Sequence, residues 1–555
     1  MKRRNFLQAS AALPAVAVAD RLPVVAAGTA GRTMDSVSPH AQTRPELDGM
    51  NVVVFITDHQ RAIMHFPPDW AETHLPGATR LQQTGVTFEN AFCNACMCSP
   101  SRATLLSGHF PAQHGVKYTL EENMPDDQYP QVSLPLDLPN IATAMSAAGY
   151  HVPYKGKWHV SKPAGSEFSP QDLLQYGFER WNPPDAGANQ DLDQTGGGDA
   201  DNDGRFMDDD GSASAGEEGV LEFLSSAAAQ QQPFFLIVSL VNPHDVLTYP
   251  STYVEGGYTD AALIGDIGLP ETMDEDLATK PTAQQSFLEL TNAGLGPLTD
   301  EQEQQNYLNF YGNLMTASDN YLVEILDTLQ DQGLLENTLV IATSDHGEMG
   351  LTHGGMRQKC FNFYEETLRV PLVYSNPRLF PESRVSQALV SHVDFLPTLA
   401  GLFAVPDAAR SDWAGVDYSA LVLDPTAESV QDYVVFTFDD FQAGQPNGPY
   451  VSPPNHIRSI REQRYKLARY FDPDGNEPEQ WEMYDLAEDP LETVNIANPS
   501  FSRTAEQEQE LQRLTAKLTE VETTRLQALP NTPEAATPEA GTPGAGTPVA
   551  AAVLA

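Results

Sequence analysis

The sequence predicts an α/β protein with a large, mostly parallel central sheet flanked by helices, followed by a smaller C-terminal subdomain. Continuous apolar runs of strand length occupy residues 51–56, 234–240 and 339–343. Runs of this kind are typical of strands that are buried on both faces of a parallel sheet. Helical patterns at residues 140–148 and 307–330 lie between them, which produces the strand and helix alternation of an α/β fold.

The C-terminal part of the chain has a different pattern. Short alternating segments at residues 433–438, 457–461, 465–467 and 483–486 are separated by turn residues, as in a small antiparallel sheet. Residues 503–528 form an amphipathic pattern, and we expect a terminal helix that packs on this sheet.

Composition excludes several classes of partner. The 555 residues include 31 basic and 76 acidic side chains, a net charge of −45. This charge argues against nucleic acid or an anionic membrane as a partner. An apolar content of 41% and a mean hydropathy of −0.34 are typical of a soluble globular protein. An anionic substrate is therefore attracted only locally, by a cluster of cations or a metal ion.

Both ends of the chain have the composition of non-core segments. Residues 1–19 contain a basic start with twin arginines and then an alanine-rich apolar run, which predicts a signal for twin-arginine export to the periplasm or the medium. Residues 20–49 are a predicted linker. Repeated Thr-Pro units dominate residues 529–555, where we expect a disordered tail.

Acidic and imidazole side chains follow each of the three buried strands. Asp58 and His59 follow the first, His244 the second, and Asp345 and His346 the third. The carboxyl ends of parallel strands meet at one edge of a sheet, where α/β folds bind their ligands. A strand-end acid alone is commonly a helix cap, but this convergence predicts an active site. Carboxylates favour Ca²⁺ or Mg²⁺, and added imidazole makes Mn²⁺ more plausible.

Residues 98–108 carry a second set of chemical groups. Ser99 is a suitable helix cap and Pro100 a suitable first helical residue, so we expect backbone N–H groups to point at an anion near Cys98. Arg102 adds a planar cation that can bind a tetrahedral oxyanion through two hydrogen bonds. The cysteine-dependent phosphatase loop has five residues between Cys and Arg, whereas this chain has three, which disfavours that family.

Two further segments supply cations. Lys157 and His159 lie two residues apart within residues 156–159, and on a β-like segment they face the same side. A solvent-facing lysine beside a structural histidine is the alternative reading. Lys359 lies shortly before the segment 364–372.

Taken in order, these motifs resemble the type I, formylglycine-dependent sulfatases of the alkaline-phosphatase-like superfamily. The resemblance implies that a formylglycine-generating enzyme oxidises Cys98 to an aldehyde, whose hydrated diol is the nucleophile. It implies a catalytic set of Cys98, Arg102, Lys157, His159, His244 and Lys359. It implies one divalent cation held by Asp58, His59, Cys98, Asp345 and His346. The sequence departs from the commonest pattern at His59, where the family often has Asp.

The resemblance implies a sulfatase catalytic domain at residues 50–403 and a C-terminal subdomain at 404–528. The expected activity is that of an arylsulfatase-like sulfuric ester hydrolase acting on a small-molecule or carbohydrate sulfate ester. A phosphonate monoester or phosphodiester hydrolase on the same fold is the main alternative, and a secreted binding protein without activity is another. The sequence does not distinguish aryl, choline and carbohydrate sulfates.

Two other features remain open. The acidic insertion at residues 185–218 contains an EF-hand-like register at Asp199, Asp201, Asp203, Gly204 and Asp210, and a solvated loop is the simpler interpretation. Cys93, Cys96 and Cys360 are left over once Cys98 is modified. No second Cys-x-x-Cys completes a zinc site, so we expect these three to be reduced or singly bridged.

Overall fold

The computed structural model describes residues 47–121, 124, 129, 131–187, 195–196, 203–207, 218–445 and 448–533. They belong to a compact unit that spans residues 41–555. The predicted signal segment, most of the linker, most of the acidic insertion and nearly all of the predicted tail lie outside the described residues.

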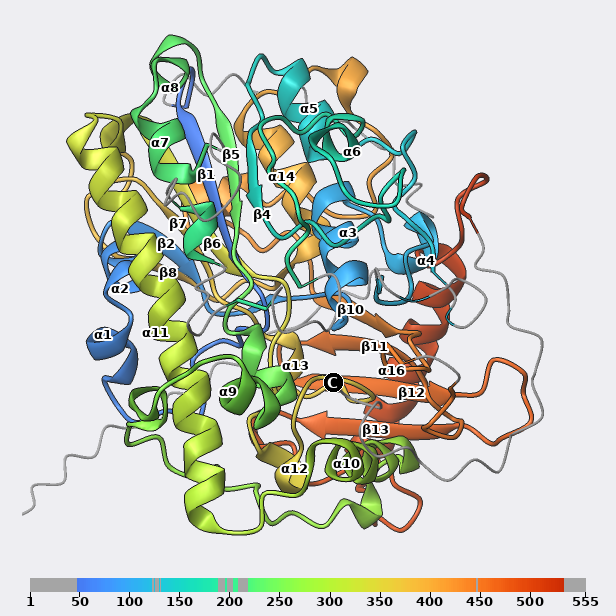
Figure 1. The fold of residues 1–555 in the computed structure, drawn as a ribbon. Coiled ribbons are helices and arrows are strands. Elements are labelled where there is room, and N and C mark those ends of the chain that lie inside the picture. Colours follow the sequence, from blue (N-terminus) through green and yellow to red (C-terminus); the bar gives the residue numbers. More distant parts are fainter. Residues whose placement is uncertain are drawn as a thin grey trace, which may run out of the picture. The chain divides into compact units, whose positions relative to one another are not determined.

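The central sheet has seven strands in the order β4-β5-β1-β6-β7-β2-β8 (Figure 1). The strands are β1 (Asn51–Thr57), β2 (Gly85–Phe88), β4 (Tyr154–Gly156), β5 (Phe235–Ser239), β6 (Thr338–Ser344), β7 (Leu372–Ser375) and β8 (Arg384–Ser386). Strand β1 pairs in parallel with β5 and β6, and only β7 runs antiparallel to its neighbours. This arrangement confirms the predicted mostly parallel sheet.

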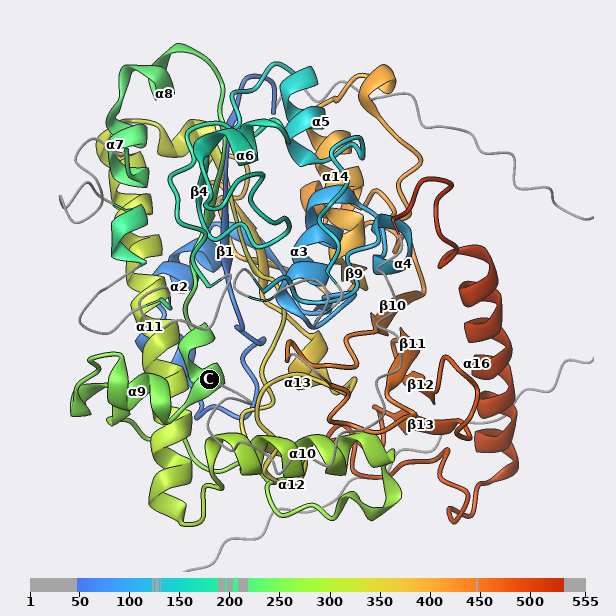
Figure 2. The same ribbon diagram turned by 45° about the vertical axis from the view of Figure 1, so that its right-hand side comes forward.

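Helices cover both faces of the sheet, which explains the continuous apolar runs. Val52, Val54 and Ile56 of β1 pack in one core with helices α3 (Cys98–Ser107), α5 (Ile141–Ala147) and α14 (Phe395–Leu402). Val53 and Phe55 point to the opposite core. There they meet α2 (Pro76–Gln83), α7 (Val220–Ser225) and the long helix α11 (Glu301–Asp331), seen on the other side of β1 in Figure 2.

Shorter elements complete the main part of the chain. The other helices there are α1 (Trp70–His74), α4 (Pro111–His114), α6 (Pro170–Leu174), α8 (Ala227–Gln231), α9 (Ser251–Glu255), α10 (Thr282–Leu295), α12 (Thr352–Gly355), α13 (Glu365–Leu368) and α15 (Ser419–Leu423). A short parallel pair, β3 (Ala91–Phe92) and β9 (Val390–Ser391), lies outside the main sheet. Within the described residues, no helix combines the length and the apolar character needed to cross a membrane.

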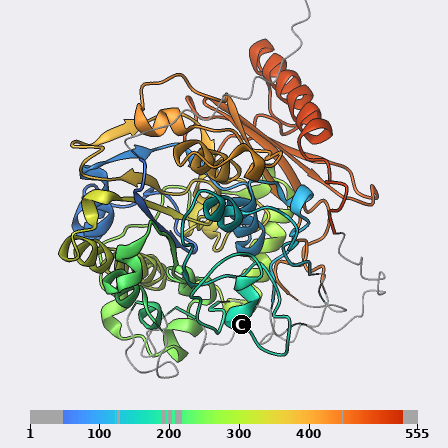
Figure 3. The same cartoon turned by 90° about the horizontal axis from the view of Figure 1, so that it is seen from above.

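The C-terminal sheet is antiparallel, as predicted, with the order β10-β11-β12-β13. Its strands are β10 (Tyr433–Phe438), β11 (His456–Glu462), β12 (Tyr465–Phe471) and β13 (Gln480–Asp485). One face packs against the terminal helix α16 (Ala505–Thr524), which lies outside this sheet in Figure 3. The other face buries aromatic residues against α10 and the segment that carries Phe361, Phe363 and Tyr364.

The observed elements lie close to the predicted ones. The strand at residues 234–240 is Phe235–Ser239, and the helix expected at 307–330 extends back to Glu301. Asn140 caps α5 by accepting hydrogen bonds from the backbone N–H groups of Ala142 and Thr143. Residue 403 is the predicted end of the catalytic domain. Tyr418 and Leu421 lie beyond it in the sequence, yet both pack in the core of the central sheet.

Candidate active site

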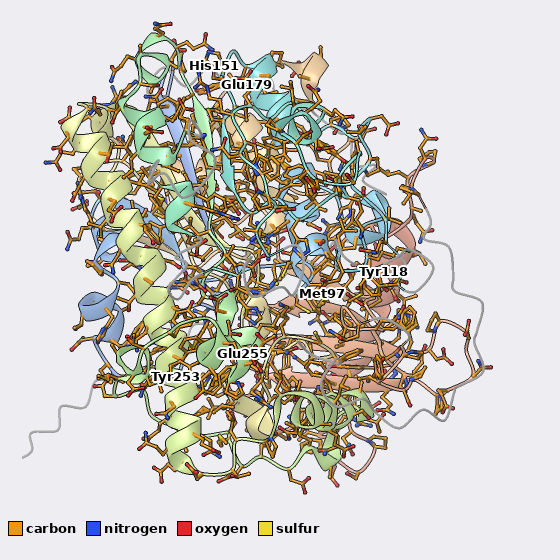
Figure 4. The ribbon with its side chains drawn as sticks, viewed as in Figure 1. Met97, Tyr118, His151, Glu179, Tyr253 and Glu255 are labelled. Atoms are coloured by element: carbon orange, nitrogen blue, oxygen red, sulfur yellow. The ribbon has the colours of Figure 1, made fainter. Side chains whose placement is uncertain are left out.

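The site lies where β1 and β6 end. Thr57 pairs with Ser344 at the last register position, so the next residues, Asp58 and Asp345, emerge side by side. The backbone N–H of Asp345 donates to the carbonyl of Thr57, which continues the ladder by one step. The ion pair of His151 and Glu179 marks the opposite edge of the sheet, far from Met97, the neighbour of Cys98 (Figure 4).

Four buried side chains converge at this edge. Asp58, Cys98, Asp345 and His346 each offer a ligand atom, and these atoms all lie within 4.8 Å of one another. His346 Nε2 is 3.2 Å from Cys98 Sγ and 3.6 Å from Oδ1 of both aspartates. Cys98 Sγ is also 3.6 Å from Asp58 Oδ1. The four side chains therefore surround one point.

The donor set fits a divalent cation. His346 Nδ1 lies 3.1 Å from the carbonyl oxygen of Gly347, so Nδ1 donates and the Nε2 lone pair points into the cluster. Two carboxylates and one imidazole are ligands that suit Ca²⁺, Mg²⁺ or Mn²⁺. Such a cation would be held by Asp58, Asp345, His346 and the side chain of residue 98.

Arg102 holds the two carboxylates in place. Its Nη2 donates to Asp58 Oδ2 over 3.1 Å and its Nε donates to Asp345 Oδ2 over 2.9 Å. Nη1 donates to Ser239 Oγ, at the end of β5, and to the Lys157 carbonyl. The guanidinium therefore links three strand ends. Its N–H groups are already used in these hydrogen bonds, so an oxyanion would have to share them.

Charge and burial set opposite pKa values for the two aspartates. Burial raises the pKa of Asp58, but Lys157, His244 and Arg102 outweigh it and hold the pKa well below its usual range. Burial and the charge of Asp58 raise the pKa of Asp345 to about 7, against the guanidinium of Arg102. Burial and Asp58 also raise the pKa of the Cys98 thiol to about 12. An unmodified Cys98 is therefore a poor nucleophile at neutral pH.

The start of helix α3 differs from the prediction. The helix begins at Cys98, and Met97 occupies the cap position without a side-chain hydrogen bond. The Ser99 hydroxyl accepts a hydrogen bond from the backbone N–H of Leu120, so it does not cap the helix. The N–H of Ser101 donates to the Met97 carbonyl within the first turn. The prediction of a Ser99 cap was wrong, because this long-range contact uses the hydroxyl.

Lys157 and His159 reach the site from the irregular segment that follows β4 and not from a strand. Strand β4 ends at Gly156, and both backbone N–H groups of Trp158 and His159 donate to the buried carboxylate of Asp185. Lys157 Nζ lies 2.7 Å from Asp58 Oδ2. His159 Nε2 faces the Leu120 carbonyl, which leaves Nδ1 as the acceptor; among the described residues Nδ1 has no hydrogen-bond partner.

His244 and Lys359 complete the wall of a small cavity beside residue 98. The cavity has a volume of about 50 Å³, and Cys98, His159, His244 and Lys359 all line it. Lys359 Nζ lies 3.7 Å from Cys98 Sγ. Burial, Lys157 and Lys359 hold the pKa of His244 well below its usual range, although Asp58 opposes them. A bound dianionic or monoanionic ester would favour the protonated imidazole.

His59 is buried at the site but lies outside the four-residue cluster. It forms a second group with Asp58 and His244, whose ligand atoms lie within 4.8 Å of one another. Its Nε2 is 2.5 Å from Glu348 Oε2 and its Nδ1 is 3.2 Å from Lys359 Nζ. Both ring nitrogens therefore already face other side chains.

Three residues at the site went unassigned in the sequence: Glu348, Ser239 and Asp185. Ser239 lies one residue before the end of the predicted buried strand 234–240, and Glu348 follows Asp345 by three residues. Their positions near the strand ends were the available signal. Asp185 lies in the acidic insertion, and nothing in the sequence distinguishes it from the other acidic residues there.

Two predictions remain, the EF-hand-like register in the acidic insertion and the state of the cysteines. Asp199, Asp201 and Asp210 lie outside the described residues, and Asp203 accepts hydrogen bonds from the backbone N–H groups of Val241 and Asn242. All four cysteines are buried free thiols. Cys360 Sγ contacts Met97 Sδ at 3.4 Å, and both residues line the cavity.

This fold and this site define a hydrolase of the alkaline-phosphatase-like superfamily. The sulfatase family matches residues 50–405, and the N-sulphoglucosamine sulphohydrolase C-terminal family matches residues 353–523. The chain belongs to the sulfatase family and is a sulfatase enzyme.

Three known proteins are similar to this chain in sequence or in fold. The ulvan-active sulfatase of Formosa agariphila is 28% identical over 76% of this chain and 72% of its own length. A putative sulfatase from Bacteroides thetaiotaomicron has a similar structure, with a TM-score of 0.66, 24% identity and coverage of 86% of this chain and 92% of its own. The phosphonate monoester hydrolase of Silicibacter pomeroyi shares the fold, with a TM-score of 0.60, 20% identity and coverage of 86% and 96%.

Proposed function

We propose that this sulfatase hydrolyses a sulfate monoester of a sugar, with formylglycine at position 98 as the source of the nucleophile. The observation that carries the proposal is the convergence of Asp58, Asp345 and His346 on residue 98, with Lys157, Lys359 and two histidines around it. This is a set of groups that can hold a tetrahedral anion and move two protons.

Oxidation of Cys98 would replace a thiol of high pKa with an aldehyde whose hydrate has two hydroxyl groups. A divalent cation held by Asp58, Asp345 and His346 would acidify such a hydroxyl and offset negative charge; we propose Ca²⁺, with Mg²⁺ and Mn²⁺ as alternatives. Arg102 keeps the two carboxylates oriented. Lys157 and Lys359 would stabilise charge on the sulfuryl oxygens.

The two histidines divide the proton transfers. One hydroxyl of the hydrate would release its proton to the solvent as its oxygen bonds to sulfur, the bond from sulfur to the sugar oxygen would break, and His244 would give the sugar oxygen a proton. His159 then removes the proton of the second hydroxyl through Nδ1, the bond from carbon to the sulfated oxygen breaks, and the aldehyde re-forms as sulfate leaves. The lone pair of His159 Nδ1 suits this second step, because Nε2 already donates to the Leu120 carbonyl.

The cavity wall supports a polar leaving group. Around the reacting centre it offers Thr119, Thr248, Gln358 and Gln445, and no described residue that lines it is Phe, Tyr or Trp. A quaternary ammonium group is commonly held by aromatic rings, so choline sulfate fits this wall less well than a hydroxyl-rich sugar. The names of the ulvan-active sulfatase and of an N-acetylglucosamine-6-O-sulfatase of Bacteroides thetaiotaomicron, 23% identical over 87% of this chain, agree with a sugar substrate.

The test is a comparison of specificity constants. We expect kcat/KM for 6-O- or 2-O-sulfated monosaccharides to exceed that for 4-nitrophenyl sulfate, and both to exceed that for an aryl phosphonate monoester. Sulfate release is followed directly by ion chromatography. A preference for the phosphonate ester would instead favour the activity of the Silicibacter pomeroyi hydrolase, which has the same fold.

Two properties of the mature protein follow from the proposal. A mass spectrum of the peptide that contains Cys98 should show the aldehyde when the host has a formylglycine-generating enzyme, and the thiol when it lacks one. Export is proposed from the twin arginines near the start of the chain. Replacement of Arg3 and Arg4 by Lys should keep the protein in the cytoplasm, as cell fractionation would show.

A further inference from the structure

The side chain of His59 connects two residues that the reaction does not otherwise join. On one side its Nε2 is 2.5 Å from Glu348 Oε2, and on the other its Nδ1 is 3.2 Å from Lys359 Nζ. We propose that Glu348 and His59 act as a positioning pair that aims the ammonium group of Lys359 at residue 98, and that His59 contributes no bond to the metal ion. This inference rests on the proposed function, which places Lys359 beside the sulfate group.

The Glu348 carboxylate accepts hydrogen bonds from several donors around it. Its Oε1 accepts hydrogen bonds from the Tyr307 hydroxyl at 2.6 Å and from the backbone N–H groups of Gly350 at 3.0 Å and Gln358 at 2.9 Å. The side chain is buried, with no exposed surface. With Oε1 saturated by donors, Oε2 is the oxygen that remains for His59.

These contacts determine which nitrogen of His59 carries the proton. An ionised carboxylate can only accept, so Nε2 must donate to Glu348. An ammonium group can only donate, so Nδ1 must present its lone pair to Lys359. Only the neutral imidazole with hydrogen on Nε2 satisfies both neighbours. A lone pair that accepts from Lys359 is not free to bind a cation.

The backbone after β1 explains how the ring of His59, which packs edge-on against His346 with the ring centroids 4.9 Å apart, also reaches Glu348. His59 has a φ of 72°, a left-handed conformation that turns the chain directly after Asp58. Its backbone N–H donates to Asp345 Oδ1 over 3.1 Å. His59 therefore orients Asp345 through its main chain, while its side chain extends toward Glu348. The cluster around residue 98 contains four ligand atoms without it.

Glu348 controls Lys359 by a second route. The backbone N–H of Gln358, the residue before Lys359, donates to Glu348 Oε1, and the Met349 N–H donates to the Gln358 carbonyl. The Glu348 carboxylate thus anchors the main chain next to Lys359 directly, and it anchors the ammonium group of Lys359 through His59. Two anchors restrict where Nζ can lie, 3.7 Å from Cys98 Sγ.

The first experiment measures metal content. Wild type, His59→Ala and Asp345→Asn are dialysed at a limiting concentration of Ca²⁺, and bound metal is counted by mass spectrometry. We expect His59→Ala to retain one ion per chain and Asp345→Asn to lose it. Loss of the ion from His59→Ala would overturn the proposal. His151→Ala, at the opposite edge of the sheet, is the matched control for a histidine substitution.

The second experiment uses a variant of nearly unchanged shape. In Glu348→Gln the amide NH₂ group would face Nε2 of His59, which would then have to accept, so the ring proton moves to Nδ1 and opposes Lys359. We expect ¹⁵N chemical shifts of histidine-labelled protein to show this exchange, with His59→Ala used for assignment. An unchanged proton position in Glu348→Gln would contradict the proposal. This spectrum and the metal count do not require that a sulfate ester is the substrate.

The third experiment asks whether His59 acts through Lys359. Loss of a residue that orients a working side chain typically costs about 10- to 100-fold in activity. We expect His59→Ala and Glu348→Gln each to reduce kcat/KM by about that factor, and His59→Ala to add nothing in a Lys359→Ala background. Additive losses in this cycle would overturn the positioning role. A wild type without sulfatase activity would refute the proposed function and leave the first two experiments interpretable.

Discussion

Arg102 and Asp345 are joined by a hydrogen bond of 2.9 Å from Nε to Oδ2, although 243 positions separate them in the sequence. The same guanidinium reaches Asp58, Ser239 and the Lys157 carbonyl. A single planar cation therefore determines how the strand ends are arranged around residue 98.

The first prediction concerns this cation. Arg102→Lys keeps the charge but cannot make these contacts together, because an ammonium group lacks the fork of the guanidinium. We expect a loss of about 3 kcal/mol in the free energy of unfolding, the usual scale for breaking a buried ion pair. Urea unfolding followed by fluorescence measures it. Arg180→Lys, at an exposed pair with Glu218, should change the free energy by less than about 0.5 kcal/mol, and an equal loss in both variants would contradict the prediction.

The second prediction separates the two halves of the proposed reaction. Cys98→Ala removes the nucleophile and should abolish turnover. Cys98→Ser supplies one hydroxyl, so it can accept the sulfuryl group once but has no second hydroxyl to expel it. We expect a single stoichiometric release of the alcohol from this variant, visible as a burst, and a sulfated serine at position 98 in its peptide mass spectrum. Repeated turnover by Cys98→Ser would refute the diol mechanism.

The third prediction concerns metal removal. Asp58 and Asp345 are buried within one cluster, and a cation that binds only the folded state stabilises it by mass action. At a concentration 100 times its dissociation constant this contribution is about 2.7 kcal/mol. EDTA should therefore lower the melting temperature and abolish activity, and added Ca²⁺ should restore both. Asp345→Asn should melt at the same temperature with and without EDTA.

The fourth prediction concerns the dependence of stability on pH. Burial raises the pKa of Glu492 to about 7, against Lys466. Burial alone would lower the pKa of His353, but its hydrogen bond to Glu275 and the nearby carboxylate of Glu366 raise it to about 9. Both groups thus keep a proton in the folded state at pH values where the unfolded chain has released it. Each of these two groups therefore contributes a free energy of unfolding that falls as the pH rises, from about 5 to 7 for Glu492 and from about 7 to 9 for His353.

Variants identify the source of this slope. Glu492→Gln removes a group whose pKa rises from 4.5 in the unfolded chain to about 7 in the folded protein, so the melting temperature of wild type relative to that of this variant should fall as the pH rises through that interval. Glu336→Gln, at an exposed position, should retain the wild-type slope. Parallel curves for wild type and Glu492→Gln would contradict the assignment.

Local pattern was sufficient for much of the fold and for part of the site. A buried strand has a continuous apolar run, whereas an amphipathic helix has apolar residues at intervals of three or four, and a few residues are enough to tell them apart. The bounds of β1, β5 and β6 were therefore predicted closely. The order of strands in a parallel sheet then explains why Asp58 and Asp345 emerge together. The antiparallel C-terminal sheet and its terminal helix were predicted from the same kind of local alternation.

The remaining features depend on contacts between distant residues. Ser99 has the chemistry of a helix cap, yet its hydroxyl serves Leu120. His59 has the chemistry of a metal ligand, yet its ring nitrogens face Glu348 and Lys359, 289 and 300 positions away. Residue type alone cannot show which of several competing partners a side chain meets, because that choice is made by the packed sheet.

The burial of Cys98 limits when it can be modified during synthesis. The side chain is 3% exposed in the finished fold, and its thiol is held in an environment that opposes ionisation. Strand β6, which closes the site over it, is completed roughly 250 residues later. At about 5–20 residues per second, a ribosome needs about 12–50 seconds to make that stretch. The enzyme that the proposed oxidation requires would therefore have to act on Cys98 in the nascent chain, and slower translation downstream of helix α3 should raise the fraction of aldehyde.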